Sequence, residues 1–317
     1  MDDRLCYRIN SQRFHRCAGA LLALTLVPLP ARPQSETPAQ PEKTQSQATP
    51  PAQRSAGIGF WDLPERILSP MLAAPPRKEA DRYARLRQYF ISFGCTGDNL
   101  SDLLLEKNTR HPILVCTLPG TTTSRIVVTA GLPRYEYFQG ASDGWPDAVM
   151  LPILYHALKA QPRHSTFVFA ELAGDHGDMD FQKHLETSES SSPLALVSVS
   201  ALGFGPPAFS NLAANDLVPA VRPNVDVLQN EAWRMLQLLR IDTTHQAVGG
   251  QFSAAPSVQR ILVRDGPKDL PRILFYSNPV VLPGRSPAVS LATLHQNHDF
   301  LAFYLGDIDN KLTPPSR

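Results

Sequence analysis

Three segments of the 317-residue chain carry side chains that can bind a metal ion or move a proton. Asp143 lies in a glycine-flanked segment, Asp175 and His176 are adjacent, and His295 and His298 are close together near the C-terminus. Carboxylates and imidazoles are common zinc ligands, and a carboxylate can also act as a general base. These residue types can therefore hold a metal ion and supply a general base for metal-assisted chemistry.

Apolar, β-branched runs alternate with amphipathic segments and predict the elements that position these side chains. Strands are expected over residues 125–130, 166–171, 194–200, 272–277 and 288–293, and a hairpin over 99–106 and 113–118. Helices are expected over residues 78–93, 146–160 and 231–239. This alternation predicts an α/β three-layer sandwich with a central mixed, mostly parallel sheet.

The chemically capable residues follow the predicted strands. Gly131, Ser200, the segment from Glu171 to His176 and the segment from Thr293 to His298 all fall at strand ends. In open α/β sheets ligands bind outside the carboxyl ends of the strands. We therefore expect these segments to meet at one edge of the sheet.

The N-terminal residues predict export rather than folding. Residues 1–31 combine arginines, an apolar run at 18–27 and the small-residue site Leu29-Pro30-Ala31, as in a signal peptide. The run is about ten residues long, too short for a bilayer of about 30 Å, although an uncleaved anchor or a buried N-terminal helix is the alternative. Residues 32–56 predict a disordered linker rich in Pro, Gln, Ser and Thr. Residues 57–317 are then a domain in the periplasm or outside the cell, with no membrane span after cleavage.

The cysteine content bears on the compartment of the protein, and the net charge limits the kinds of partner that it can bind. Only Cys95 and Cys116 lie beyond the predicted signal, and they predict either a disulfide or two buried thiols. The formal net charge is +1, which offers no electrostatic basis for binding nucleic acid or an anionic membrane. With 43% hydrophobic and 19% charged residues, the chain can build a globular core.

The ordered segments resemble the co-catalytic zinc aminopeptidase and glutamate-carboxypeptidase family (the M-twenty-eight peptidases) over roughly residues 78–305. The family strand Asn-Val-Ile-Ala-x-Leu-Pro-Gly is similar to residues 113–120, Ile-Leu-Val-Cys-Thr-Leu-Pro-Gly. The family motif Gly-Ala-x-Asp-Asn-x-Ser-Gly is similar to residues 140–147, Gly-Ala-Ser-Asp-Gly-Trp-Pro-Asp. The resemblance makes Asp143 the metal-bridging ligand, whereas the residues alone favour a helix N-cap.

The remaining motifs imply further roles. The family has a strand followed by Glu-Glu, and spacing from Phe169-Ala170 assigns Asp175 as general base and His176 as metal ligand. Glu171 is a rival for either role, and a polar surface loop is the alternative. Residues 287–290, Pro-Ala-Val-Ser, are similar to the strand before the last imidazole ligand, which makes His295 or His298 that ligand.

Three positions lose a side chain that binds the metal or orients a ligand in the family. Gly131 replaces a histidine ligand, Pro133 replaces the aspartate that orients it, and Ser200 replaces a carboxylate ligand. The resemblance then implies a degenerate member that binds at most one tightly held zinc ion. Its ligands would be Asp143, His176 and His298 or His295, the positions that related glutaminyl cyclases use.

Two functions follow from this resemblance. In the first, the protein is impaired or inactive as a two-zinc aminopeptidase and binds a protein partner. In the second, it is a residual one-zinc hydrolase or glutaminyl-cyclase-like enzyme that acts on peptide N-termini or small amides.

Overall fold

The computed structural model describes residues 64–76, 78–104, 112–131, 144–172, 181, 183–185, 193–211, 218–241, 269–277 and 289–313. The predicted signal peptide and linker lie outside these residues. Within them, no helix has the length and apolar composition needed to cross a bilayer.

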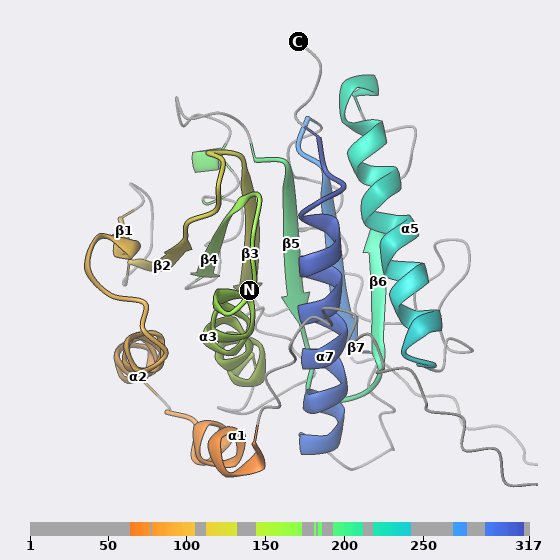
Figure 1. The fold of residues 1–317 in the computed structure, drawn as a ribbon. Helices are drawn as coiled ribbons and strands as arrows, with labels where there is room; N and C mark the ends of the chain where they lie inside the picture. Colours follow the sequence, from red (N-terminus) through yellow and green to blue (C-terminus); the bar gives the residue numbers. More distant parts are fainter. Residues whose placement is uncertain are drawn as a thin grey trace, which may run out of the picture. The chain divides into compact units, whose positions relative to one another are not determined.

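The centre of the described fold is a mixed sheet of seven strands, in the order β1-β2-β4-β3-β5-β7-β6 (Figure 1). The strands are β1 (Leu100–Leu103), β2 (Ile113–Leu118), β3 (Arg125–Gly131), β4 (Thr166–Leu172), β5 (Ala195–Ser200), β6 (Pro207–Asn211) and β7 (Arg272–Ser277). The neighbours β4, β3, β5 and β7 run parallel to one another. Strands β1, β2 and β6 pair antiparallel with their neighbours. The predicted mixed sheet with a parallel centre is confirmed.

Helices cover both faces of this sheet. The longer ones are α1 (Glu65–Leu72), α2 (Glu79–Ser92), α3 (Trp145–Lys159), α5 (Arg222–Leu238) and α7 (Leu291–Ile308), with 3-10 turns at Gly97–Asn99 and Pro219–Val221. These five helices share one core cluster with Val128, Phe167 and Phe169 of the sheet. On the other face, helical Phe181 and Leu185 pack with alternate strand residues. Successive side chains along a strand thus contribute to two cores, one on each face of the sheet. The sheet and the helices on its two faces form three layers.

Helices α2 and α3 lie close to their predicted positions. Leu86 and Phe90 are buried on α2, and Gly94, with a φ of 89°, follows its C-terminal end. Helix α3 has Pro146 in its first turn, as expected, and is buried almost all round. It lies against α2, α7 and the strands β3 and β4, which explains why its sequence is apolar on every side.

A disulfide joins Cys95 and Cys116, and this settles the question that the sequence left open. Hairpin register pairs Cys116 with Leu100 rather than with Cys95. The 3-10 turn at Gly97–Asn99 redirects the chain between Cys95 and β1. Both cysteines are completely buried, so the bond ties the end of α2 to β2 inside the core.

The prediction of a strand over residues 288–293 is wrong. Ser290 is the N-cap of α7 and accepts a hydrogen bond from the Thr293 amide, and the chain is helical from Leu291 to Ile308. The apolar residues Leu294, Leu301 and Leu305 recur at helical spacing beyond the short run that suggested a strand. Helix α5 also begins nine residues earlier than predicted, at residue 222 rather than 231. Strand β6 and helix α1 were not predicted.

Candidate functional site

The carboxyl ends of the central parallel strands meet at one edge of the sheet. Gly131, the last residue of β3, pairs with Leu172 at the end of β4. Ala130 pairs with Val199, so the end of β3 also lies beside Ser200, the last residue of β5. The ends of β3, β4 and β5 therefore lie side by side in the backbone, whereas the segment from Thr293 to His298, which was also expected at a strand end, belongs to a helix.

The described residues contain some of the predicted site residues. Asp143, Asp175, His176 and Pro133 lie outside them, so their roles stay predictions. The N-cap of α3 is Gly144, one residue later than the alternative interpretation of Asp143 as N-cap requires.

His295 and His298 lie within α7 rather than in a loop after a strand. His295 is half-buried and His298 is fully buried. Nδ1 of His298 lies 3.0 Å from Oδ1 of Asp299, and Nε2 is buried with no hydrogen-bond partner among the described residues. A carboxylate that holds one imidazole nitrogen and leaves the other available is typical of a metal-binding histidine. The helical position was not expected, but the hydrogen bonding of His298 is compatible with the predicted role.

Asp147, which the sequence analysis did not single out, holds the turn that follows β5. Its side chain lies in the first turn of α3 and is buried. One carboxylate oxygen accepts a hydrogen bond from the Ala201 amide at 2.7 Å, and the other accepts one from the Leu202 amide at 2.8 Å. Burial raises the pKa of Asp147 to about 6, although these two amides and the charge of Arg82 oppose the rise. The available sequence signal was an acidic residue directly after proline at the start of an apolar helix.

The same turn is held from α7 and β7. The Asn297 side chain donates to the carbonyl oxygens of Leu202 and Gly205, and the Ser277 hydroxyl also donates to Gly205 at 2.7 Å. The Ser290 amide donates to the Gly203 carbonyl at 2.9 Å. Hydrogen bonds from α3, β7 and the region around the start of α7 thus fix the turn that follows β5.

Glu171 is the other buried acid at this edge. It is 3% exposed, and its Oε2 atom has no hydrogen-bond partner among the described residues. Burial raises the pKa of Glu171 to about 7, Arg82 opposes this rise, and Glu79 adds to it. The guanidinium of Arg82 lies 5.6 Å from the ring centre of Trp145. Glu171 can therefore hold or release a proton near neutral pH, which keeps it a rival to Asp175 for that role.

The described residues do not fit a two-zinc centre. Among them, no three His, Cys, Asp or Glu side chains lie close enough to hold a metal ion. Glycine offers no side-chain ligand at position 131, and the neutral hydroxyl of Ser200 is a poor one. A single zinc ion would depend on Asp143 and His176.

The fold is shared with solved structures. The glutaminyl cyclase of Fimbriiglobus ruber is 12% identical with a TM-score of 0.50, over 77% of this chain and 93% of that one. The LapA aminopeptidase of Legionella pneumophila is 13% identical with a TM-score of 0.50, over 78% and 71% of the two chains. The chain has the zinc-exopeptidase-like α/β fold. The glutaminyl cyclase of Tannerella forsythia is similar to the same degree, at 12% identity and a TM-score of 0.50, over 76% and 96% of the two chains.

No protein-family model and no curated protein sequence matches this chain. At such low identities the structural likeness shows the fold and leaves the activity to be argued from the site.

Proposed function

We propose that this chain is an exported protein of the zinc-exopeptidase fold that does not work as a two-zinc aminopeptidase. The observation that carries this proposal is the pair of strand ends at Gly131 and Ser200. The resemblance places one metal ligand at each of these positions, and neither residue supplies a carboxylate or an imidazole. A second zinc ion would then lack donors, so the domain acts by binding, with a protein as its partner.

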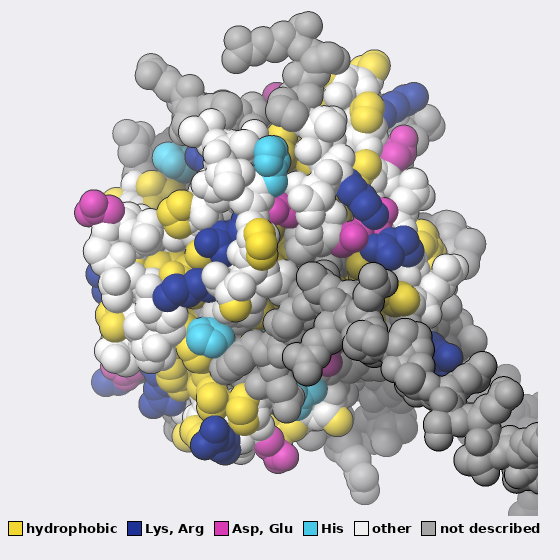
Figure 2. Space-filling model, in the orientation of Figure 1, with side chains coloured by type: hydrophobic (Ala, Val, Ile, Leu, Met, Phe, Trp, Pro, Cys, Tyr) yellow, Lys and Arg dark blue, Asp and Glu magenta, His cyan; other side chains and the backbone are white. Residues whose placement is uncertain are grey.

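The disulfide supports export. A buried bond between Cys95 and Cys116 persists in oxidising compartments and is rare in the cytosol. A signal at residues 1–31 and a linker at 32–56 would deliver the domain of residues 57–317 to the periplasm or the exterior. We expect no nucleic-acid partner, since the net charge is +1 and both signs of charge occur on the face in Figure 2.

Elemental analysis of protein purified without chelator tests the proposal. We expect at most one zinc ion per chain and no rapid cleavage of amino-acid amides. The variant Gly131→His/Ser200→Asp should raise the zinc content. The control Thr121→His/Ser101→Asp adds the same groups at two exposed positions and should not. Two zinc ions in the unmodified protein, with an amidase activity abolished by Asp143→Asn, would contradict the proposal.

His298 favours a second candidate, a one-zinc hydrolase or glutaminyl-cyclase-like enzyme. Its buried Nε2 is without a partner among the described residues, while Asp299 holds Nδ1. Asp143, His176 and His298 or His295 would hold the ion, which supplies Lewis acidity toward a carbonyl group. Asp175 or Glu171 would take the proton from the nucleophile. The substrate would be a peptide N-terminus or a small amide.

The two histidines of α7 allow a paired test of this candidate. His298→Gln should lower the zinc content to zero while His295→Gln leaves it at one, or the reverse if His295 is the ligand. Zinc content near zero in the unmodified protein would remove the one-zinc candidate and leave the non-catalytic proposal in place.

A further inference from the structure

The turn after β5 depends on one buried carboxylate. The amides of Ala201 and Leu202 both donate to Asp147. Ala201 has a φ of 55°, a left-handed conformation that non-glycine residues adopt only when their surroundings hold them there. An ionised carboxylate accepts with both oxygens, whereas a protonated carboxyl uses one oxygen as a donor. Protonation of Asp147 would therefore break one of the two bonds.

We propose that Asp147 is a pH-sensitive latch on the candidate site: its ionised form fixes the turn that follows Ser200, and its protonation loosens that turn. The latch rests on the proposed function in one respect, which is that the candidate site lies at the carboxyl ends of the central parallel strands. It makes Asp147 a positioning residue, which acts through the turn rather than on a ligand.

The charges around Asp147 set the pH at which the latch acts. Among the described residues, Arg82 of α2 is the charged side chain that acts on Asp147, and it favours the ionised form. The turn itself contributes backbone amides. Helix α7 and strand β7 contribute the neutral side chains of Asn297 and Ser277. Burial raises the pKa of Asp147 to about 6, so the change falls between neutral and mildly acidic pH.

The loosening should be local. Asn297 and Ser277 hold the far part of the turn through the carbonyl oxygens of Leu202 and Gly205, and neither contact depends on Asp147. The residues that gain freedom are then Ala201 and the adjoining end of β5. This end carries Ser200 and lies beside Gly131.

A second aspartate provides an internal reference. The carboxylate of Asp309 accepts from two consecutive amides, those of His164 at 2.6 Å and Ser165 at 2.7 Å, just before β4 begins. Asp309 is also buried. The Asp309 contact lies at the amino end of a parallel strand, whereas the Asp147 contact lies at a carboxyl end. The two contacts therefore report on opposite ends of the parallel strands.

Amide hydrogen exchange of the full chain, read by NMR in the presence of EDTA, tests the latch. The measured quantity is the protection of the Ala201 and Leu202 amides divided by that of the His164 and Ser165 amides. We expect this ratio to fall as the pH is lowered from 8 to 5. A ratio that stays constant over this range would overturn the proposal, and this measurement needs no variant.

Two substitutions sharpen the result. Asp147→Asn has one accepting oxygen and imitates the protonated form, so at pH 8 it should lower the ratio roughly tenfold, as expected for losing a hydrogen bond to a charged group. The ratio in this variant should not change with pH. Arg82→Met should move the midpoint of the fall to higher pH, while the control Arg66→Met, at an exposed position on α1, should not.

The outcomes separate the latch from the proposed function. An Asp147→Asn variant that keeps the full ratio at pH 8 removes the latch and leaves the zinc stoichiometry argument untouched. Two zinc ions per chain would remove the proposed function and leave the exchange result standing, since EDTA is present throughout.

Discussion

Glu171 is an acidic residue in an apolar, buried environment that disfavours its ionised form. Its side chain lies on the same face of β4 as Phe167 and Phe169, beneath the helices. Burial raises its pKa to about 7. A carboxyl group kept in this way contributes proton-transfer capacity at the expense of stability, which is common at functional sites.

The Glu171→Gln variant should be more stable than the unmodified protein at pH 8. The pKa of Glu171 is raised from 4.5 when unfolded to about 7 when folded, so folding takes up a proton between these values. Stability therefore falls as the pH rises through this window and stays low above it. One pKa unit corresponds to about 1.4 kcal/mol, which gives a gain of roughly 3 kcal/mol at pH 8 and little gain at pH 4. Urea unfolding at both pH values measures this, with exposed Glu65→Gln as control. An equal effect at the two pH values would show that Glu171 titrates normally.

Gly120 is a second residue whose surroundings decide what it can be. A Cβ atom there would lie 2.2 Å from the Ser165 carbonyl oxygen, which belongs to the backbone and cannot turn aside. Gly120→Ala should therefore destabilise the fold by about 1–3 kcal/mol or more. Gly97→Ala separates this clash from backbone strain, since its Cβ would meet open space and only its φ of 60° is unfavourable. Thermal unfolding of both variants provides the comparison, and a smaller loss for Gly120→Ala would contradict the argument.

At the scale of elements, local pattern predicted the strands and helices with strong periodicity. The apolar runs of β3, β4, β5 and β7 and the spacing of Leu86 and Phe90 on α2 led to nearly correct bounds. The pattern failed at α7, where Val289 and Ser290 continued an apparent strand and the capping role of Ser290 decided otherwise. Strand β6 is five residues long and pairs with β7, which lies far along the chain, so its own sequence carried little signal.

The candidate site could be predicted only in part, because some of its contacts join residues that lie far apart in the sequence. The strand ends at Gly131 and Ser200 follow from strand boundaries. The role of Asp147 depends on a contact across 54 positions of sequence, which no local pattern encodes. The pairing of Cys95 likewise depends on the short turn before β1 rather than on hairpin register.

The disulfide should contribute to the stability of the first hairpin and of α2. Its cysteines are 21 positions apart, and a loop of this size corresponds to about 3 kcal/mol in the chain-entropy account. The double variant Cys95→Ala/Cys116→Ala should lose about this much in denaturant unfolding. Reductant should destabilise the unmodified protein and leave the double variant unchanged. A double variant as stable as the parent would mean that the bond constrains little.

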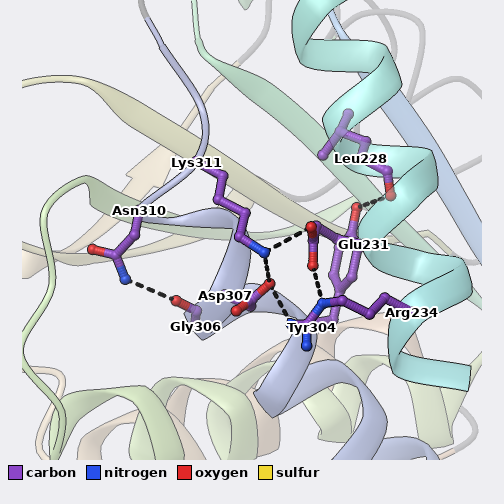
Figure 3. A network of polar contacts seen from close by, with 8 residues as sticks. All are labelled: Leu228, Glu231, Arg234, Tyr304, Gly306, Asp307, Asn310 and Lys311. Atoms are coloured by element: carbon purple, nitrogen blue, oxygen red, sulfur yellow. Dashed lines mark hydrogen bonds and ion pairs between the residues drawn. The ribbon is translucent and has the colours of Figure 1, made fainter. Parts of the chain in front are cut away.

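Helices α5 and α7 are joined by charged side chains, shown in Figure 3. Glu231 contacts Arg234 at 2.6 Å and Lys311 at 2.7 Å, and Asp307 contacts the same two bases at 2.6 and 2.7 Å. The Glu231 side chain is only 11% exposed, while its partners Arg234 and Lys311 are 45% and 39% exposed, so solvent screens these contacts in part. A network of this kind can stabilise the packing of the two helices more than an exposed ion pair does.

A double-mutant cycle between Glu231→Gln and Lys311→Met should measure a coupling of about 1–3 kcal/mol, as for hydrogen bonds to charged groups. The more exposed pair of Arg87 and Asp102 should couple by less than about 1 kcal/mol in the same assay. Raising the salt concentration should reduce the second coupling more than the first. Equal coupling in the two pairs would argue against a special role for the network.

At the scale of the whole molecule, the folded domain should be independent of the N-terminal residues. Deletion of residues 1–56 should leave the midpoint of thermal unfolding within about 1 °C, because residues 1–31 are predicted to serve as a signal and the linker at 32–56 is too poor in apolar residues to add to a core. The same deletion should abolish export in a host that secretes the full chain. A large fall in the unfolding midpoint would show that residues 1–56 pack on the domain.

The position of β7 has a consequence for synthesis on the ribosome. Strand β6 ends at residue 211, and its partner β7 begins at residue 272, so 61 further steps of synthesis precede their pairing. At roughly 5–20 residues per second, this leaves a nascent chain with β6 and one side of β5 unpaired for roughly 3–12 s. Chains stalled in this interval expose strand edges of the kind that aggregate. The protein should therefore depend on chaperones that hold nascent chains more than its folded structure suggests.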